Sequence, residues 1–394
     1  KAIVLGFKDL FLLRKRIPAL FQHYGAVAGA REGLGEDGVE LLADTLGPRF
    51  ELRCPLGVSL AEDDRRILTL TEQQMDALDL LSRQRRVVIR GAAGTGKTVL
   101  AAEKARRLGR EGFRVLLTCF NRGLAQHLTA SLAGTPNVSV KTFNTLCHDL
   151  AVEADLPVPE DVTGRDAQQH LFRKQHPTLL MQALEWLPDR RFDAIVVDEA
   201  QDFWEEWWVP LCLCLEDPDD GILYAFLDAN QRVYQRPMGL PDGAVEATLS
   251  RNLRNTQRIH RAASRYFQGE AVVAVGPEGR DVEYVPVAST ADIPKELSRL
   301  LHRLIRDDGV RPGDIAVLTG RALEHCGLDK VTSIGAFPVT SDPAPGTVVV
   351  LQSVHRFKGL ERPVVVLADV NELSATYADS VMYVGLTRAR VHAI

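Results

Sequence analysis

The sequence predicts an α/β protein of two lobes, each a doubly wound parallel sheet covered by helices. Short apolar runs recur with helical stretches between them, and this alternation is typical of parallel sheets. It occurs in two series, one before and one after the turn signal Pro241-Asp-Gly243. A glycine-rich loop directly follows the run Val87–Ile89, and the carboxyl end of a strand is where such folds bind ligands.

Each predicted strand is one of these apolar runs. The first series is Val87–Ile89, Val115–Thr118, Val138–Val140, Ile195–Val197 and Ile222–Leu227. The second is Val282–Val287, Ile315–Leu318, Val348–Leu351 and Val364–Leu367, with a helix around Ile293–Ile305. We expect a first lobe at 66–248 with a small helical insertion at about 150–191, a second lobe at 249–394, a join near Val245–Ser250, and an N-terminal segment 1–65 without an assigned role.

Composition limits the possible classes of protein. The chain has 394 residues, 45% hydrophobic and 25% charged, with a net charge of −5. This balance argues against a wholly basic nucleic-acid binder but leaves room for a local basic groove. Six cysteines form no C-x-x-C pair, and no apolar stretch is long enough to span a bilayer. We therefore expect a cytoplasmic protein with no membrane partner, and a fragment, because the chain starts without Met.

The segment Gly91-Ala-Ala-Gly-Thr-Gly-Lys-Thr98 has the full G-x-x-x-x-G-K-[ST] pattern of a phosphate-binding loop. Gly91, Gly94 and Gly96 let the backbone turn its N–H groups toward a phosphate. Lys97 can reach the β and γ oxygens, and the Thr98 hydroxyl can bind Mg²⁺. Chance alone would give such a pattern in about one per cent of chains of this size. The context favours a nucleoside triphosphate site.

Two adjacent carboxylates end the apolar run at Ile195–Val197. Asp198 and Glu199 would emerge beside the phosphate loop if this run is a strand of the same sheet. We expect Asp198 to hold Mg²⁺ and Glu199 to orient and deprotonate the attacking water. A plain surface turn after the strand is the alternative, and the matched phosphate loop upstream argues against it.

The chain resembles superfamily 1 helicases of the UvrD/Rep type, because segments similar to that family's motifs occur in the family's order between Leu70 and Arg388. Besides the phosphate loop and Asp198-Glu-Ala-Gln-Asp202, they are Leu70-Thr-Glu-Gln-Gln74, Thr118-Cys-Phe-Asn-Arg122, Thr142-Phe-Asn-Thr145, Asp228-Ala-Asn-Gln231, Asn252-Leu-Arg-Asn-Thr256, His355-Arg-Phe-Lys-Gly-Leu-Glu361 and Tyr383-Val-Gly-Leu-Thr-Arg388. The resemblance implies two RecA-like lobes, with only residues 322–347 where well-known members insert a whole domain.

The resemblance also implies roles for individual residues. Gln74 would recognise adenine, Gln231 would sense the γ-phosphate, Glu361 would lie near the ribose, and Gly359 would belong to the nucleotide-binding residues. Arg254 and Arg388 would contact the phosphates from the second lobe, which suits a reaction that needs charge neutralisation. Nucleic acid would contact a further set of residues: Phe120, Asn121, Arg122, Thr142, Phe143, Tyr234 and His355.

Some positions depart from the family's pattern. Leu253 stands where many members have a Tyr that stacks on adenine, and Cys119 replaces an aromatic residue that would line the strand. The first departure predicts relaxed selectivity for adenine. The second argues against stacking on the bases of the strand, for which Phe120, Phe143 and Tyr234 remain the candidates. Trp204, Trp207 and Trp208 share one face of a helix by spacing, which favours core packing over stacking on bases.

These observations predict an enzyme that uses ATP and Mg²⁺ to move along or unwind single-stranded nucleic acid, with DNA the expected strand. The alternative is a nucleotide-driven regulatory switch that controls a partner protein such as a nuclease, although the chain itself shows no nuclease pattern. Stimulation of ATP hydrolysis by single strands would distinguish the two classes.

Overall fold

A computed structural model of the protein describes residues 55–72, 75–159, 162, 164–228, 243–267, 272–326, 328–342, 346–370, 373 and 375–394. All described residues belong to one compact unit, Pro55–Ile394. No described helix is both long and apolar enough to cross a membrane.

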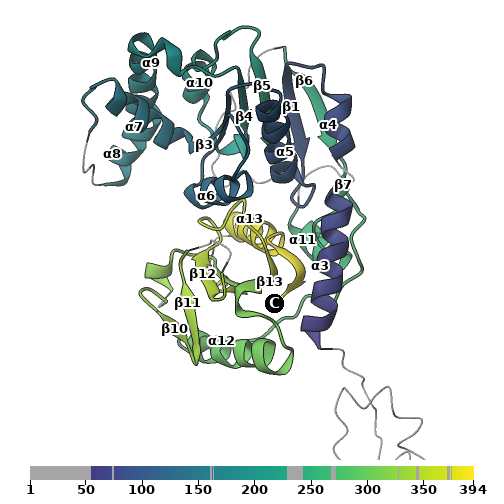
Figure 1. Ribbon diagram of the computed structural model, residues 1–394. Coiled ribbons are helices and arrows are strands. Elements are labelled where there is room, and N and C mark those ends of the chain that lie inside the picture. The colour runs from purple at the N-terminus through teal and green to yellow at the C-terminus, as the bar shows by residue number, and fades with distance from the viewer. Residues whose placement is uncertain are drawn as a thin grey trace, which may run out of the picture. The chain divides into compact units, whose positions relative to one another are not determined.

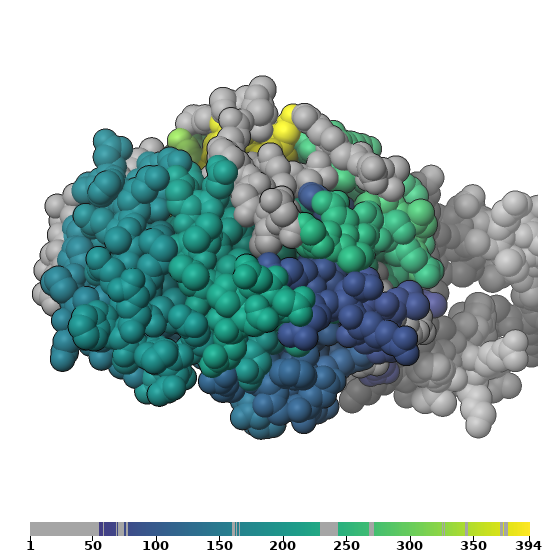
Figure 2. Space-filling view, turned by 90° about the horizontal axis from the view of Figure 1, so that it is seen from above, coloured from purple at the N-terminus to yellow at the C-terminus, as the bar shows by residue number. Residues whose placement is uncertain are grey.

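The first sheet has six parallel strands in the order β3-β2-β4-β5-β1-β6. They are β1 (Arg86–Gly91), β2 (Val115–Cys119), β3 (Val138–Thr142), β4 (Ala194–Val197), β5 (Ile222–Leu227) and β6 (Val245–Leu249). The parallel sheet is as predicted. β6 covers most of the segment expected to join the lobes, but it pairs with β1 at the edge of the sheet. In Figure 2 the green surface of the residues near 250 accordingly lies beside the purple surface of residues below 100.

Helices cover both faces of this sheet because neighbouring strand residues point to opposite sides. Val87 and Ile89 pack with Leu100 and Leu108 of α5, whereas Val88 packs toward α7, α9 and α10. The helices are α4 (Asp76–Leu80), α5 (Lys97–Arg110), α6 (Arg122–Ser131), α7 (Phe143–Glu153), α8 (Arg165–His170), α9 (His176–Trp186) and α10 (Trp208–Leu213). The stretch expected as a helical insertion contains α8, a π-helical turn at Leu171–Gln175 and α9, which lie beside α7 (Figure 1).

The three tryptophans do not share one helix. Trp204 precedes a 3₁₀ turn at Glu205–Trp207, and Trp208 begins α10. Trp207 and Trp208 are nonetheless buried, and Trp204 packs against the same hydrophobic cluster. Core packing was therefore the right interpretation, although the helical spacing behind it was wrong.

The second sheet has the order β10-β11-β12-β9-β13-β14, parallel throughout except for the antiparallel pair β10–β11. Its strands are β9 (Ile315–Thr319), β10 (Ser333–Ile334), β11 (Phe337–Thr340), β12 (Val349–Ser353), β13 (Arg362–Ala368) and β14 (Ala389–Ala393). A separate small ladder joins β7 (Arg251–Asn252) and β8 (Val273–Ala274). Between β9 and β12 the described residues form only a 3₁₀ turn and the β10–β11 pair.

The strand expected at Val282–Val287 is absent. This segment is irregular, and Glu283 donates a backbone hydrogen bond to the Ala393 carbonyl of β14 at 3.1 Å. Pro286 lacks an N–H group and Tyr284 is exposed, so the apolar pattern does not produce a ladder here. The remaining predicted strands and the helix around Ile293–Ile305 are present, the latter as α12 (Ile293–His302) followed by a π-helical turn at Arg303–Asp307.

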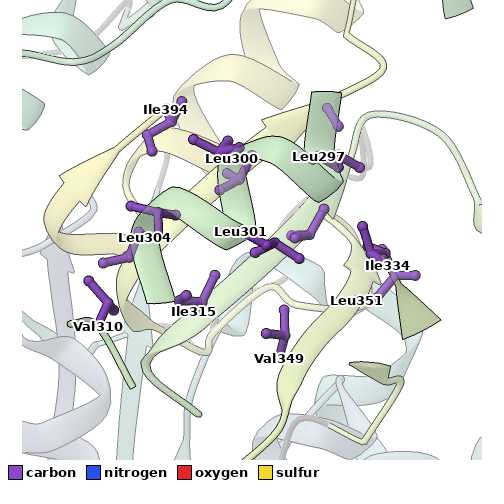
Figure 3. Packing of buried hydrophobic residues seen from close by; sticks show 14 of the residues in the cluster. Leu297, Leu300, Leu301, Leu304, Val310, Ile315, Ile334, Val349, Leu351 and Ile394 are labelled. Carbon is purple, nitrogen blue, oxygen red and sulfur yellow. The ribbon is translucent and has the colours of Figure 1, made fainter. Parts of the chain in front are cut away.

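One face of the second sheet is covered by α12, whose leucines recur at helical spacing. Leu297, Leu300, Leu301 and Leu304 point toward the strand residues Ile315, Val349 and Leu351 (Figure 3). Leu301 is fully buried, so truncation to Ala would cost about 2–5 kcal/mol of stability. The other face packs against α11 (Gln257–Ala263) and α13 (Ala375–Leu386).

Helix α3 (Leu56–Glu72) packs on the same cluster as α12. Leu56, Leu60 and Ile67 are buried there with residues of the second sheet. The boundary that we expected at 65/66 therefore falls inside a helix that packs against the second lobe. Apolar spacing locates a helix but does not say which sheet it covers.

The remaining short turns are 3₁₀ segments at Pro188–Arg190, Ala200–Asp202, Ser264–Tyr266, Thr290–Asp292 and Pro312–Asp314.

Candidate nucleotide site

The phosphate loop connects β1 to α5, as its position after an apolar run predicts. Gly94 and Gly96 have φ values of 79° and 80°, a region that glycine enters without strain. Lys97 is buried, and its Nζ donates to the carbonyls of Gly91 and Ala92 at 2.8 Å each. The same Nζ lies 3.6 Å from Oδ2 of Asp228, so the ammonium is held at the loop by neighbouring acceptors.

Asp198 follows β4 and is fully buried. Burial and the neighbouring charge of Glu199 raise its pKa to about 7, against hydrogen bonds from the Thr98 hydroxyl and the Glu199 N–H. Thr98 and Asp198, the two residues expected to hold Mg²⁺, thus lie together as hard oxygen donors, and these fit that ion. Among the described residues no group of three His, Cys, Asp or Glu side chains could hold a metal. A cation bound here would depend on few protein ligands, as Mg²⁺ beside phosphates usually does.

Glu199 has a left-handed backbone, with φ 54° and ψ 42°. Such a conformation costs a non-glycine residue roughly 1–3 kcal/mol and tends to occur at functional sites. Gln201 donates from its amide to Oε2 of Glu199 and accepts the backbone N–H of Asp228 at 2.9 Å. Burial raises the pKa of Glu199, but Lys358, Lys97 and Arg388 outweigh it, and the pKa is lowered. Glu199 is therefore held ionised among cations.

Lys358 is a site residue to which the sequence analysis gave no role. Its Nζ lies 2.7 and 2.8 Å from the two carboxylate oxygens of Asp202 and 3.6 Å from Oε2 of Glu199. Burial lowers the pKa of Lys358, and the carboxylates of Asp202 and Glu199 more than restore it, so the pKa is raised overall. The sequence did contain a signal for this pair. Lys358 lies inside the segment His355–Glu361, and Asp202, which had no assigned role, lies inside the segment Asp198–Asp202.

Arg254 and Glu361 form an ion pair, with Nη2 of the arginine 2.6 Å from Oε2 of the glutamate. Burial lowers the pKa of Arg254 more than the Glu361 carboxylate raises it, so the pKa is lowered overall. Arg390 and Arg388 also lower it, and Asp198 raises it. Arg388 is 4% exposed, and its guanidinium donates to the carbonyls of Val384 and Leu360 at 3.1 and 3.4 Å. The structure thus brings Arg254, Arg388 and Glu361 to the carboxylates of the first sheet.

The other expected nucleotide contacts are only partly described. Gly359 has a φ of 82°, and a Cβ there would lie 2.8 Å from Cδ2 of Leu124 in α6. Only glycine therefore fits between these two segments. Gln74 and Gln231 lie outside the described residues.

Phe143 does not fit its expected role in stacking on bases. It begins α7, is fully buried, and stacks on Trp207 with ring centroids 4.3 Å apart. Thr142, whose hydroxyl caps α7 by accepting the Thr145 N–H at 3.1 Å, is also buried. Helix capping and core packing account for the contacts of Phe143 and Thr142 in the described structure, and their contact with a nucleic-acid strand stays a prediction. Phe120 is half-buried and stacks on Trp207 at 6.0 Å, and Tyr234 lies outside the described residues.

Asn121, Arg122 and His355 form a more accessible group. Asn121 caps α6 and donates from Nδ2 to the carbonyls of His355 and Arg356 at 3.4 and 3.1 Å. His355 is half-buried and its ring stacks on Tyr377, whose hydroxyl it also contacts. Arg122 and Arg356 are exposed near this contact, and their guanidinium groups suit phosphate oxygens.

Comparison with known proteins identifies two regions. Residues 349–394 match the UvrD-like helicase C-terminal domain, which covers β12 to β14 with Lys358, Glu361 and Arg388. Residues 79–225 match an AAA domain, which covers β1 to β4 and the first part of β5, with the phosphate loop and Asp198-Glu199. The C-terminal part of the chain is thus similar to UvrD-like helicases, and the region that carries the phosphate loop is similar to an AAA domain. The two matches fall on the two sheets described above, in the order that the resemblance in the sequence predicts.

Solved structures give more distant likenesses to the chain. The PRRSV helicase is 13% identical with a TM-score of 0.39, over 83% of this chain and 53% of that one. The arterivirus nonstructural protein 10 helicase solved with DNA is 12% identical, with a TM-score of 0.36, over 84% and 62%. A structure of Pif1 helicases at forked DNA is 12% identical, with a TM-score of 0.40, over 82% and 91%. The chain spans only about half to three fifths of the two viral proteins, and curated proteins give no match.

Proposed function

We propose that the chain is an ATP-driven motor that moves along single-stranded nucleic acid, with DNA the expected strand. The observation that carries the proposal is the convergence of cations from both lobes on one pair of carboxylates. Lys97 follows β1 of the first sheet, Lys358 and Arg388 lie between strands of the second sheet, and Arg254 follows β7 of the small β7–β8 ladder. Phosphoryl transfer needs this kind of charge neutralisation more than it needs covalent chemistry. Polarity from 3′ to 5′ follows from the resemblance alone.

Each charged group has a proposed task. Lys97 binds the β and γ phosphates, and Glu199 orients the attacking water and accepts its proton. Arg254 and Arg388 stabilise the charge that develops in the transition state. Thr98 and Asp198 would hold Mg²⁺, which would neutralise the phosphate oxygens when bound. Glu361 positions Arg254 through their ion pair.

Movement along the strand would follow because the site is built from residues of both lobes. A γ-phosphate that binds Lys97 and the two arginines together favours approach of the lobes, and its loss after hydrolysis removes that bridge. Asn121 and His355, which already meet across the two sheets, would change their contact during this cycle. Arg122 and Arg356 beside them supply phosphate contacts that do not depend on base sequence.

A second candidate function keeps the nucleotide chemistry but not the motor. Phe143 is buried in the first core, so the described residues offer less base stacking than a strand track would use. This favours, as the alternative, a regulatory ATPase whose lobes close on nucleotide to control a partner such as a nuclease.

The proposal is tested by substitutions at Lys97 and Glu199, which should affect ATP binding and ATP hydrolysis differently. Lys97→Ala should weaken both ATP binding and hydrolysis, because the phosphates lose their cation. Glu199→Gln should still bind ATP but stall at hydrolysis, because an amide cannot accept the proton. Equilibrium binding and single-turnover hydrolysis measure the two steps separately. Normal hydrolysis by Glu199→Gln would remove Glu199 from the role of base.

A further inference from the structure

The phosphate loop is hydrogen-bonded from the second lobe at Ala93 and Gly94. The N–H of Ala93 donates to the Tyr383 hydroxyl of α13 at 3.1 Å, and its carbonyl accepts from Nδ2 of Asn252 at 3.2 Å. The carbonyl of Gly94 accepts the N–H groups of Leu253 and Arg254 at 3.1 and 3.2 Å. Four hydrogen bonds therefore hold two consecutive residues of the loop.

Side-chain packing matches these hydrogen bonds. Ala93 is 3% exposed, and it is buried in the hydrophobic cluster of α11 and α13 that also contains Tyr383. A Cβ at Gly94 would lie 2.2 Å from Oδ1 of Asn255 and 2.5 Å from Nδ2 of Asn252. The small residues in this half of the loop therefore make room for the second lobe as well as for a phosphate.

The contact continues toward Arg388. Asn252 and Asn255 are each 1% exposed, and Nδ2 of Asn252 donates to Oδ1 of Asn255 at 3.0 Å. Nδ2 of Asn255 in turn donates to the carbonyls of Thr387 and Ala389 at 3.2 and 2.6 Å. The backbone on both sides of Arg388 is thereby connected to the phosphate loop through two buried amides.

We propose that Tyr383 and Asn252 are positioning residues that brace the phosphate loop from the opposite lobe and so set its affinity for ATP. The inference rests on the proposed ATP site. These contacts engage Ala93 and Gly94 and leave residues 95–98, at the start of α5, to the phosphates. A preorganised loop loses less freedom on binding, so the brace raises affinity. Because neither residue touches the reacting atoms, its loss raises the KM for ATP more than it lowers kcat.

The test is Tyr383→Phe, which removes the hydroxyl and keeps the buried ring. Loss of one buried hydrogen bond predicts a rise of about 5- to 10-fold in both KM and the Kd of a non-hydrolysable fluorescent ATP analogue. The kcat should stay within about twofold of the parent value, as expected for loss of ground-state affinity. Tyr266→Phe is the matched control, because Tyr266 packs against the same cluster and has no contact with the phosphate loop among those described. Thermal unfolding of each variant checks that the fold is retained.

A second variant separates bracing from simple loosening of the fold. Asn252→Ala should raise the same Kd, and the double variant should lose less affinity than the two single losses combined, because both side chains hold Ala93. Unchanged or tighter analogue binding by Tyr383→Phe, with the parent binding normally, would overturn the brace and leave the ATP site intact. A lower kcat at unchanged KM would also overturn it. A parent chain that binds no analogue would instead overturn the proposed function, and the brace with it.

Discussion

Lys358 and Asp202 form a buried ion pair between two segments that are 156 residues apart in the chain, with Nζ 2.7 Å from Oδ1. The lysine is 4% exposed and the aspartate 2%, so water shields neither charge. Asp202 lies in the 3₁₀ turn after Glu199, and Lys358 lies in the turn between β12 and β13. The pair therefore connects the loop that carries the proposed base to the second lobe.

Removing Lys358 alone should be costly. Lys358→Met leaves the Asp202 carboxylate buried without its main cation, and such a change typically destabilises a protein by about 3–5 kcal/mol. The double variant Lys358→Met with Asp202→Asn should recover much of that loss, which urea unfolding can measure. Equal stability of the single and double variants would contradict the buried pair.

The same substitution should move the pH dependence of hydrolysis. Lys358 is the main charge that lowers the pKa of Glu199, so its removal lets that pKa rise. The base is then protonated at a higher pH, and the acid limb of the kcat profile shifts to higher pH. If the acid limb of the kcat profile did not shift, Lys358 would not control the protonation of Glu199.

The two arginines should affect the rate more than binding. Arg254→Ala and Arg388→Ala should each lower turnover by at least about 100-fold, because arginine fingers act on transition-state charge. Nucleotide affinity should change less. Steady-state hydrolysis and direct ATP binding distinguish the two effects. Normal turnover by either variant would show that its arginine does not reach the γ-phosphate.

Acid should destabilise the first lobe through His176. Burial lowers the pKa of His176 to about 4, whereas an unfolded histidine titrates near 6.5. The unfolded state therefore takes up a proton first as the pH falls, and stability is lost between about pH 6.5 and 4. His176→Gln should flatten the unfolding free energy across this window, while His170→Gln, at an exposed position, should not. If the unfolding free energies of the parent and of His176→Gln fell in parallel across this window, His176 would not be the cause of the acid destabilisation.

The sequence allowed much of the fold to be predicted, because parallel strands buried on both faces read as continuous apolar runs. Val282–Val287 has the same appearance and forms no strand, since an apolar run does not show whether a ladder partner is available. Part of the site could be predicted because segments similar to the family's motifs occur in the family's order. Asp198, Glu199, Arg254 and Arg388 lie close enough for their charges to interact. Lys358 and Tyr383 were missed as site residues because their roles depend on which turns meet in space. The burial of Phe143 could not be predicted, because an aromatic residue fits stacking on bases and core packing equally well.

The isolated chain should translocate but separate long duplexes poorly. Between β9 and β12 the described residues form only a 3₁₀ turn and the β10–β11 pair, where the resemblance implies a whole inserted domain in well-known members, so little surface is left to meet a duplex. Displacement of streptavidin from biotinylated single strands, compared with strand displacement on a long duplex, measures the two activities in one preparation. Processive unwinding by the chain alone would contradict this prediction.

The central claim, a motor driven by ATP on single strands, is tested most directly by the ATP hydrolysis rate with and without single-stranded DNA. We expect strong stimulation at low salt that weakens as salt rises, because phosphate contacts carry the binding. The Glu199→Gln variant serves as the baseline for contaminating ATPase. Hydrolysis that is the same with and without single-stranded DNA at every salt concentration would contradict the motor and favour the regulatory switch.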